Sequence, residues 1–323
     1  AATLFSVAFD ACAGELDYAD LTDFSGADVT PIHDLQLQME SVVLVWQGVT
    51  KGVDTALNNA ASVFSRIQST TSPRTRAACL YSHGTLLLLA GRIDDARRQL
   101  DAALELAQSC GDIRRQLSVY INNGVALMEA GEPSVARHSL EKAATATNVH
   151  FRIRCYTNLA ILHYEEGDVR LAVQAAESVL SMNASYQSPS LGSTSYAILG
   201  LVALAQHDFE GAKMYRASIN DQSWHSLDDA SYTAIFLSRL LVLAGKESEA
   251  LMVLDDTVSN TRARNVLCTL RLEVEKAGQL VRSQPDTAYR LAKHIEQEAE
   301  ALGAKRLLVR ARDVLLQVRT QSS

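Results

Sequence analysis

The chain has 323 residues, of which 47% are hydrophobic, and it carries a formal net charge of −7. This composition is sufficient for a large buried core. The longest strongly apolar run, Leu86 to Ala90, is too short for a membrane-spanning helix. The acid excess also disfavours binding to the phosphate backbone of nucleic acids. Only five prolines and seven phenylalanines occur, while alanine and leucine are abundant, and this balance favours helix over strand.

Charge is unevenly distributed between the two ends. No lysine or arginine precedes Lys51, and residues 1–50 carry eight acids, whereas residues 304–323 carry five bases and one acid, a local charge of +4. We interpret both ends as solvated faces, with docking to partners as the alternative. If the chain did bind DNA, the residues to test first would be Arg306, Arg310 and Arg319. Because Ala1 is not an initiator methionine, we expect the chain to be a piece of a larger protein.

Residues 1–33 show no repeat and are predicted to form an acidic segment of helix and loop. Three aspartates here, Asp17, Asp20 and Asp23, are three residues apart. Calcium loops need acids two residues apart and a following glycine, so we predict no metal site. The five cysteines form no C-x-x-C pair, which is typical of reduced, buried thiols in a cytoplasmic protein.

A repeat of about forty residues organises the rest of the chain. Gly84, Gly91, Ala96, Leu100 and Ala103 are followed at the same spacing by Gly124, Gly131, Ala136, Leu140 and Ala143. Weaker copies place the turn position at residues 52, 91, 131, 167, 207, 245 and 283. A fixed period of this size indicates stacked helical hairpins. We predict about seven helix pairs over residues 34–302, and a C-terminal capping helix over residues 303–323.

Each spacing that recurs along the chain has a physical meaning within one hairpin. The turn glycine supplies the left-handed backbone that ends the first helix. The small residue seven positions earlier lets the second helix approach closely, with the alanine five residues past the turn as its counterpart. In the first pair these positions predict Leu57, Ala61 and Phe64 as inward residues of the second helix. Leu100 and Leu140 are predicted to fill the seam to the next repeat.

At these residues the chain resembles the tetratricopeptide (TPR) family. The resemblance covers about residues 34–302, and the unit is longer than the usual 34 residues. Long units resemble the arrays attached to bacterial signal-responsive regulators, such as activators of the maltose-regulator type, and some eukaryotic scaffolds. The resemblance implies an all-α, right-handed superhelix. It also implies a non-catalytic module that binds a ligand or protein, as the sensor or interaction domain of a larger bacterial regulator. The alternative is a constitutive scaffold that joins partners.

Catalytic motifs are not apparent in the sequence. It contains no phosphate-binding glycine loop, no nucleophile elbow and no zinc-type histidine pair. His83 and His163 are expected to be partly buried core histidines, with a role in a groove as the alternative. We therefore predict no enzymatic activity, no cofactor and no metal.

The remaining candidate is the concave groove, which the first helices line in resembling families. Asn122 and Asn158 lie two residues before the small residue of adjacent repeats, and an amide can pair with the peptide backbone of a ligand. The alternative is that both amides bond to neighbouring helices or water. We expect Arg154 and Arg239 to offer charge to an acidic group. The further predicted contacts are Tyr81, Ser82, Tyr164, Glu165 and Tyr232.

Two features of the groove were left open by the sequence. Its far end, with Ile198 and Phe236, is predicted to be either an apolar patch or core, and core is favoured. The expected partner is a peptide, a protein segment or a small signal molecule, with no nucleic acid and no membrane. The oligomeric state is not predicted.

Overall fold

A computed structural model describes residues 32–67, 71–186, 192–219 and 227–321. Within these ranges the chain forms fifteen α-helices and no strand. The expectations for residues 1–31, including the three aspartates, lie outside the described residues. The helices are α3 (Ile32–Lys51), α4 (Val53–Phe64), α5 (Pro73–Leu89), α6 (Ile93–Ser109), α7 (Ile113–Glu129), α8 (Pro133–Ala144), α9 (Val149–Glu165), α10 (Val169–Tyr186), α11 (Ser193–Ala205), α12 (Phe209–Ser218), α13 (Leu227–Leu243), α14 (Glu247–Thr261), α15 (Val266–Leu280), α16 (Pro285–Leu302) and α17 (Lys305–Gln321).

The helices form seven consecutive pairs, α3–α4 to α15–α16, followed by α17. Each first helix packs against its own second helix and against the first helix of the next pair. The predicted all-α repeat array is therefore confirmed. Among the described residues, no helix has both the length and the apolar composition needed to cross a bilayer.

The turn glycines of four of the seven pairs confirm the predicted left-handed backbone, whereas the turn at Ser283 does not have a positive φ. Gly91, Gly131, Gly167 and Gly245 have φ between +73° and +80°. In the fifth pair His207 takes the same place with φ +61°, and it is the one non-glycine residue with positive φ in the described ranges. Residues other than glycine adopt this backbone conformation only at a cost in free energy.

Close approach within the hairpins is also confirmed. A Cβ added to Gly84 would lie 3.3 Å from the carbonyl oxygen of Ala96 and 2.9 Å from Cγ of Leu100. Leu100 thus fills its own hairpin, and it also packs with Val119 of α7 as predicted. Gly124 stands in the same relation to Leu140.

The predicted register of the first pair was wrong by one residue. The buried face of α4 is Val53, Ala56, Ala60 and Val63, whereas Ala61 is exposed. Only Gly52 separates α3 from α4, while three residues separate α5 from α6. The shorter connection rotates α4, so that its inward positions come one residue earlier.

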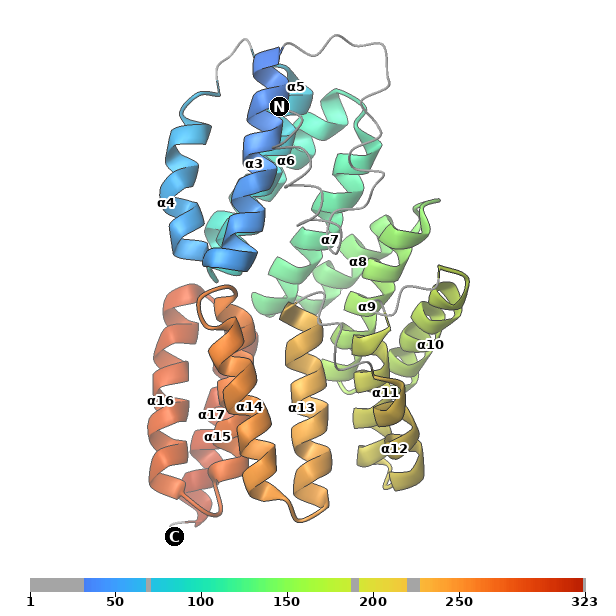
Figure 1. The fold of residues 1–323 in the computed structure, drawn as a ribbon, viewed down its shortest axis with the longest axis vertical. Helices are drawn as coiled ribbons and strands as arrows, with labels where there is room; N and C mark the ends of the chain where they lie inside the picture. The colour runs from blue at the N-terminus through green and yellow to red at the C-terminus, as the bar shows by residue number, and fades with distance from the viewer. Residues whose placement is uncertain (1–31, 68–70, 187–191, 220–226, 322–323) are drawn as a thin grey trace.

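The array closes on itself. In Figure 1 helices α14 to α17 lie directly below the N-terminal pair α3–α4. The backbone N–H of Val53 donates to the carbonyl of Ala263 at 2.8 Å. The turn at Gly91 contacts Leu302, and the turn at Gly131 contacts Lys305. The hairpin turns of the first three pairs therefore rest on a loop and on helix ends of the last repeats.

The hydrophobic core follows this closure. One cluster of buried side chains joins Leu87 and Ile93 of the N-terminal repeats to Leu270, Ala292 and Leu307 of the C-terminal ones. A second cluster runs through α7 to α15. Since apolar side chains fill the contact between the two ends, the array buries more than a chain of isolated hairpins would.

Candidate functional site

Charged and tyrosine side chains from four first helices and from the final helix α17 meet in the interior of the array. We call this group the interior charge network, and its members come from α7, α9, α13, α15 and α17. They are Glu129, Tyr164, Glu165, Tyr232, Arg239, Arg271, Glu275, Arg306 and Arg310.

Glu129 is the most buried carboxylate of the network, with 1% of its side chain exposed. Its Oε1 accepts a hydrogen bond from Nη2 of Arg271 at 3.0 Å and another from Nη2 of Arg306. Glu129 is the last residue of α7, and Arg306 is the second residue of α17. The helix dipole disfavours an acid at a C-terminus and a base at an N-terminus. Each charge is therefore held in place by the other and not by its own helix.

Arg239 anchors the other side of the network. It donates to both carboxylate oxygens of Glu275 at 2.7 Å, in the bidentate geometry that makes such pairs strong, and to the hydroxyl of Tyr164 at 3.0 Å. Arg310 reaches Glu275 at 3.4 Å and Glu165 at 3.8 Å. Arg310 thus links α17 to both α15 and α9.

Tyr232 joins the two sides. Its hydroxyl lies 3.4 Å from Oε1 of Glu165, and its ring lies 4.8 Å from the guanidinium carbon of Arg271. Arg271 also donates to the hydroxyl of Ser231 at 3.0 Å. The aromatic ring therefore supports the arginine that bonds to Glu129.

Glu165 and Glu275 stay ionised at neutral pH because neighbouring arginines lower their pKa. Burial raises the pKa of Glu165, but the charges of Arg310, Arg306, Arg271 and Arg239 outweigh it and leave that pKa below its ordinary value. Burial likewise raises the pKa of Glu275, and its bonds to Arg239 reverse the effect. Three carboxylates face four guanidinium groups, so one positive charge is in excess.

The contacts put this excess at Glu129, where one carboxylate faces Arg271 and Arg306, but Arg239 is the most exposed guanidinium group of the network. Its side chain is 39% exposed although its hydrogen bonds face the network. Arg310 is 23% exposed. The arrangement can therefore attract an anionic group to the Arg239 side without breaking the buried pairs at Glu129.

Four of the sequence-predicted site residues meet in this network: Tyr164, Glu165, Tyr232 and Arg239. The sequence analysis missed Glu129, Arg271, Glu275 and the role of Arg306 and Arg310. One signal was present, because Glu129 and Glu165 both lie two residues before a turn glycine. Their partner arginines on α17 are more than a hundred residues away, and only the closed array identifies them.

The predicted exposure of Ser82 and Asn122 was wrong. Ser82 is buried, and its hydroxyl bonds to Ser41 of α3 at 3.3 Å. Asn122 is buried, and its amide donates to Thr85 at 2.9 Å and to the Tyr81 hydroxyl at 3.2 Å. At Ser82 and Asn122 this position thus faces the preceding first helix and not the groove.

Other groove positions differ in burial. Ile198 and Phe236 are fully buried, which confirms the core interpretation. Asn158 and Arg154 of α9 are half-buried, so they remain available as contacts. Tyr81 is half-buried beneath the guanidinium group of Arg115, 4.7 Å from its ring centroid.

His83, His163, Cys79 and Cys155 behave as core residues. His83 stacks on Phe64 at 4.5 Å between ring centroids, and His163 is buried. Burial lowers the pKa of both imidazoles. Burial raises the pKa of the thiol of Cys79 to about 11 and that of Cys155 to about 12, so both remain protonated. Among the described residues, no cluster of three acidic, histidine or cysteine side chains is arranged to hold a metal ion.

Comparison with known protein families identifies the family of this chain. The sequence profile of the protein kinase G tetratricopeptide repeat family matches residues 69–312, which is more than half of the chain. The chain belongs to the protein kinase G tetratricopeptide repeat family. No curated protein matches it.

Solved structures share the architecture of this TPR array. A Rap protein complexed with Competence and Sporulation Factor aligns with a TM-score of 0.63 at 12% identity, over 99% of this chain and 97% of that one. NprR in complex with its cognate peptide NprX aligns at 0.60 and 17%, over 90% and 84%. Aspartyl phosphate phosphatase F from Bacillus subtilis aligns at 0.53 and 13%, over 98% and 91%. At these identities the likeness shows a shared TPR-like fold.

Proposed function

We propose that this TPR array is a non-catalytic binding module, the sensor or interaction domain of a larger cytoplasmic bacterial regulator. Its ligand is a peptide or protein segment that carries an acidic group. The observation that carries this proposal is the net positive charge of the interior charge network, whose most exposed guanidinium group is that of Arg239. Two solved structures of the same fold, named as complexes with NprX and with Competence and Sporulation Factor, support a peptide as the ligand class.

The half-exposed guanidinium groups give the proposed binding mode. A ligand carboxylate approaches Arg239 and Arg310 from the solvent side, while Glu275 keeps the bidentate pair that fixes Arg239 in place. Asn158 and Arg154 lie on α9, the helix that also supplies Tyr164. An amide at Asn158 can pair with a peptide unit of any sequence, so charge selects the ligand and the amide adds affinity.

An array of acidic and neutral pentapeptides tests this proposal. Acidic peptides are expected to bind the intact chain, and Arg239→Gln is expected to weaken binding at least about tenfold, the size of one charge-assisted hydrogen bond. The matched control is Arg282→Gln, an exposed arginine in the turn between α15 and α16. Equal binding of acidic and neutral peptides, or equal loss in both variants, contradicts the proposal.

A constitutive scaffold is the alternative class. A scaffold would hold a folded partner through the outer face, and Arg239→Gln would leave that binding unchanged. One similar structure is named a phosphatase. We nevertheless propose no catalytic role, because the imidazoles of His83 and His163 pack in the core, His83 against Phe64.

A further inference from the structure

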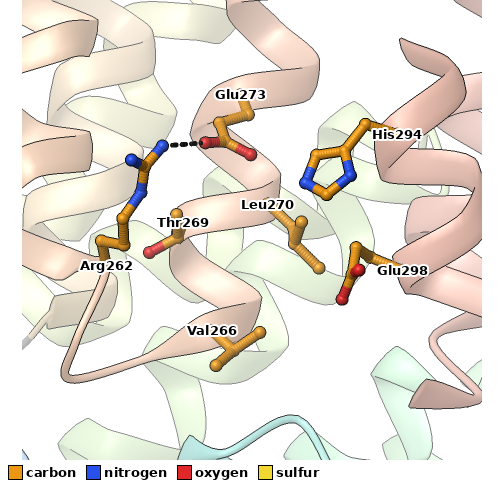
Figure 2. Close-up of a pocket in the computed structure, with 7 residues that line it drawn as sticks. All are labelled: Arg262, Val266, Thr269, Leu270, Glu273, His294 and Glu298. Atoms are coloured by element: carbon orange, nitrogen blue, oxygen red, sulfur yellow. Dashed lines mark hydrogen bonds and ion pairs between the residues drawn. The ribbon is translucent and has the colours of Figure 1, made fainter. Parts of the chain in front are cut away.

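An open surface cavity of about 350 Å³ lies outside the interior charge network, between α15, α16 and the loop that follows α14. Figure 2 shows the seven side chains that line it. They are Arg262, Val266, Thr269, Leu270, Glu273, His294 and Glu298. The volume lies at the lower end of the range for ligand pockets and fits one long side chain. Nothing in the proposed peptide-binding function uses this cavity.

Glu273 is the buried charge of the cavity, with 9% of its side chain exposed. Within the described residues its ion pair is with Arg262, whose Nη2 donates to Oε1 at 2.8 Å. The Arg262 side chain is 69% exposed, so the pair lies at the rim. A carboxylate can accept several hydrogen bonds at once. Glu273 therefore has capacity for a second cationic donor from the cavity side.

The opposite wall is formed by His294 and Glu298, one helical turn apart on α16. Both are exposed at the surface of α16, and in Figure 2 their side chains extend from α16 into the space across from Glu273. With Arg262 as one positive charge and two glutamates as two negative charges, the lining has a net charge of −1. The cavity therefore favours a ligand that carries one positive charge.

The floor of the cavity is apolar apart from the hydroxyl of Thr269, which already has hydrogen-bond partners within the chain. Leu270 is buried, and Val266 is half-buried beside it. The hydroxyl of Thr269 bonds to Thr261 at 3.1 Å and to the carbonyl of Asn265 at 3.0 Å. The floor thus suits the methylene stem of a long cationic side chain, which packs on apolar surface while its head stays polar.

We propose that this cavity binds a guanidinium group on an aliphatic stem, presented by an arginine of a protein segment or by free arginine. The planar head can donate to Glu273 and Glu298 together and lie against the imidazole of His294. A compact ammonium group cannot make both contacts with the same geometry. Arg262 shows within the chain itself that Glu273 accepts a guanidinium donor.

The test uses blocked arginine (acetyl-arginine amide), a Gly-Arg-Gly peptide, blocked lysine and blocked citrulline, the neutral analogue of arginine. Binding to the intact chain is measured by isothermal titration calorimetry. The two arginine probes are expected to bind, lysine more weakly, and citrulline at least about tenfold more weakly than arginine. Tighter binding of the peptide identifies a protein segment as the source, and equal binding identifies free arginine.

Variants locate the site. Glu298→Gln is expected to weaken arginine binding at least about tenfold, and because Glu298 is exposed the variant should fold. Glu300→Gln, also exposed on α16, is the matched control and should bind normally. Arg262→Gln should bind equally or more tightly, since it removes the competing guanidinium group. Equal binding of citrulline, or an unchanged affinity in Glu298→Gln, would overturn the proposal.

The outcome is independent of the peptide-binding proposal. Arg239 lies in the interior charge network, so Arg239→Gln should leave arginine binding unchanged. Glu298 lies in the cavity, so Glu298→Gln should leave the binding of acidic peptides unchanged. Failure of one proposal can therefore be told from failure of the other.

Discussion

Glu129 holds distant parts of this chain together through a single carboxylate. It ends α7, yet it accepts from Arg271 of α15 and Arg306 of α17. Local helix energetics disfavour both Glu129 and Arg306 at their positions. Their placement makes sense only as a contact between repeats that lie on opposite sides of the closed array.

Glu129→Gln is expected to destabilise the chain by about 3 kcal/mol, because removing one partner leaves buried charges without compensation. Urea unfolding followed by circular dichroism measures the change. Glu141→Gln, an exposed change of the same charge on α8, is the control and should stay within about 0.5 kcal/mol. An unchanged midpoint for Glu129→Gln would show that the ion pair contributes nothing net.

Replacing His207 by glycine is predicted to stabilise the chain, in contrast to the substitution at Glu129. A non-glycine residue at φ +61° costs roughly 1–2 kcal/mol, while glycine adds up to about 1 kcal/mol of unfolded-state entropy. His207→Gly should therefore raise stability by up to about 1 kcal/mol, and His207→Ala should not. The thermal midpoints of both variants decide it, and a loss in the glycine variant would mean that the contact with the Phe209 ring outweighs the backbone strain.

At the scale of the elements, each hairpin depends on the closeness of its two helices. A Cβ at Gly124 would lie 2.7 Å from Leu140, a distance at which something must shift. The same contact recurs at Gly84, so it is a property of the repeat and not of one pair. Leu140 fills the space that the missing side chain leaves.

Gly124→Ala is expected to cost about 1–3 kcal/mol by overpacking. Leu140→Ala alone should cost about 2–5 kcal/mol by leaving a cavity. Together the two changes should cost less than the sum, because the new methyl group enters the space that the leucine vacates. A double-mutant cycle in urea measures the coupling, and strict additivity would show that the two side chains do not share this space.

At the scale of the whole molecule, the array is a closed body and not an open spiral. The C-terminal helices α14 to α17 lie next to the N-terminal pair α3–α4 (Figure 1). The two ends meet through a backbone hydrogen bond from Val53 to Ala263, through the contacts of Gly91 and Gly131, and through the ion pairs of Glu129. The concave side is therefore lined by a charge network whose accessible part is at Arg239.

Closure should depend on pH. The pKa values of Glu165 and Glu275 are lower in the folded chain than their ordinary value, which is about 4.3 for glutamate. A carboxyl of this kind contributes stability that is present above its unfolded pKa and is lost as pH falls through its folded pKa. The thermal midpoint should therefore fall steadily below about pH 4.

Arg310→Gln makes that prediction specific. Without Arg310 the two carboxyls lose one of the charges that lower their pKa, so stability should fall at neutral pH and depend less steeply on pH in the acid range. Melting curves from pH 3 to 7 compare this variant with Arg282→Gln, which should follow the unchanged chain. Parallel curves for all three proteins would show that the network does not govern the acid response.

The sequence by itself determined the repeat, the helix pairs and most turns, because these depend on short spacings. Gly84, Gly91 and Ala96 lie within one hairpin, and small residues, turn glycines and apolar faces act locally. It also selected Tyr164, Glu165, Tyr232 and Arg239, which the structure brings together in one network, although their predicted role as ligand contacts stays a prediction. It misjudged Ser82 and Asn122, since the rotation of one first helix against the next is not encoded in the spacing.

Only the tertiary structure decided how the ends of the array meet. Arg306 belongs beside Glu129, although 177 residues separate them. No local pattern specifies such a pair, because it depends on the small rotation that each of several repeats adds to the last. For the same reason the cavity at Glu273 and Glu298 could not be predicted, as its walls come from helices whose relative orientation is set by packing. Local spacing fixed the repeating unit, and accumulated geometry fixed the surfaces that the unit creates.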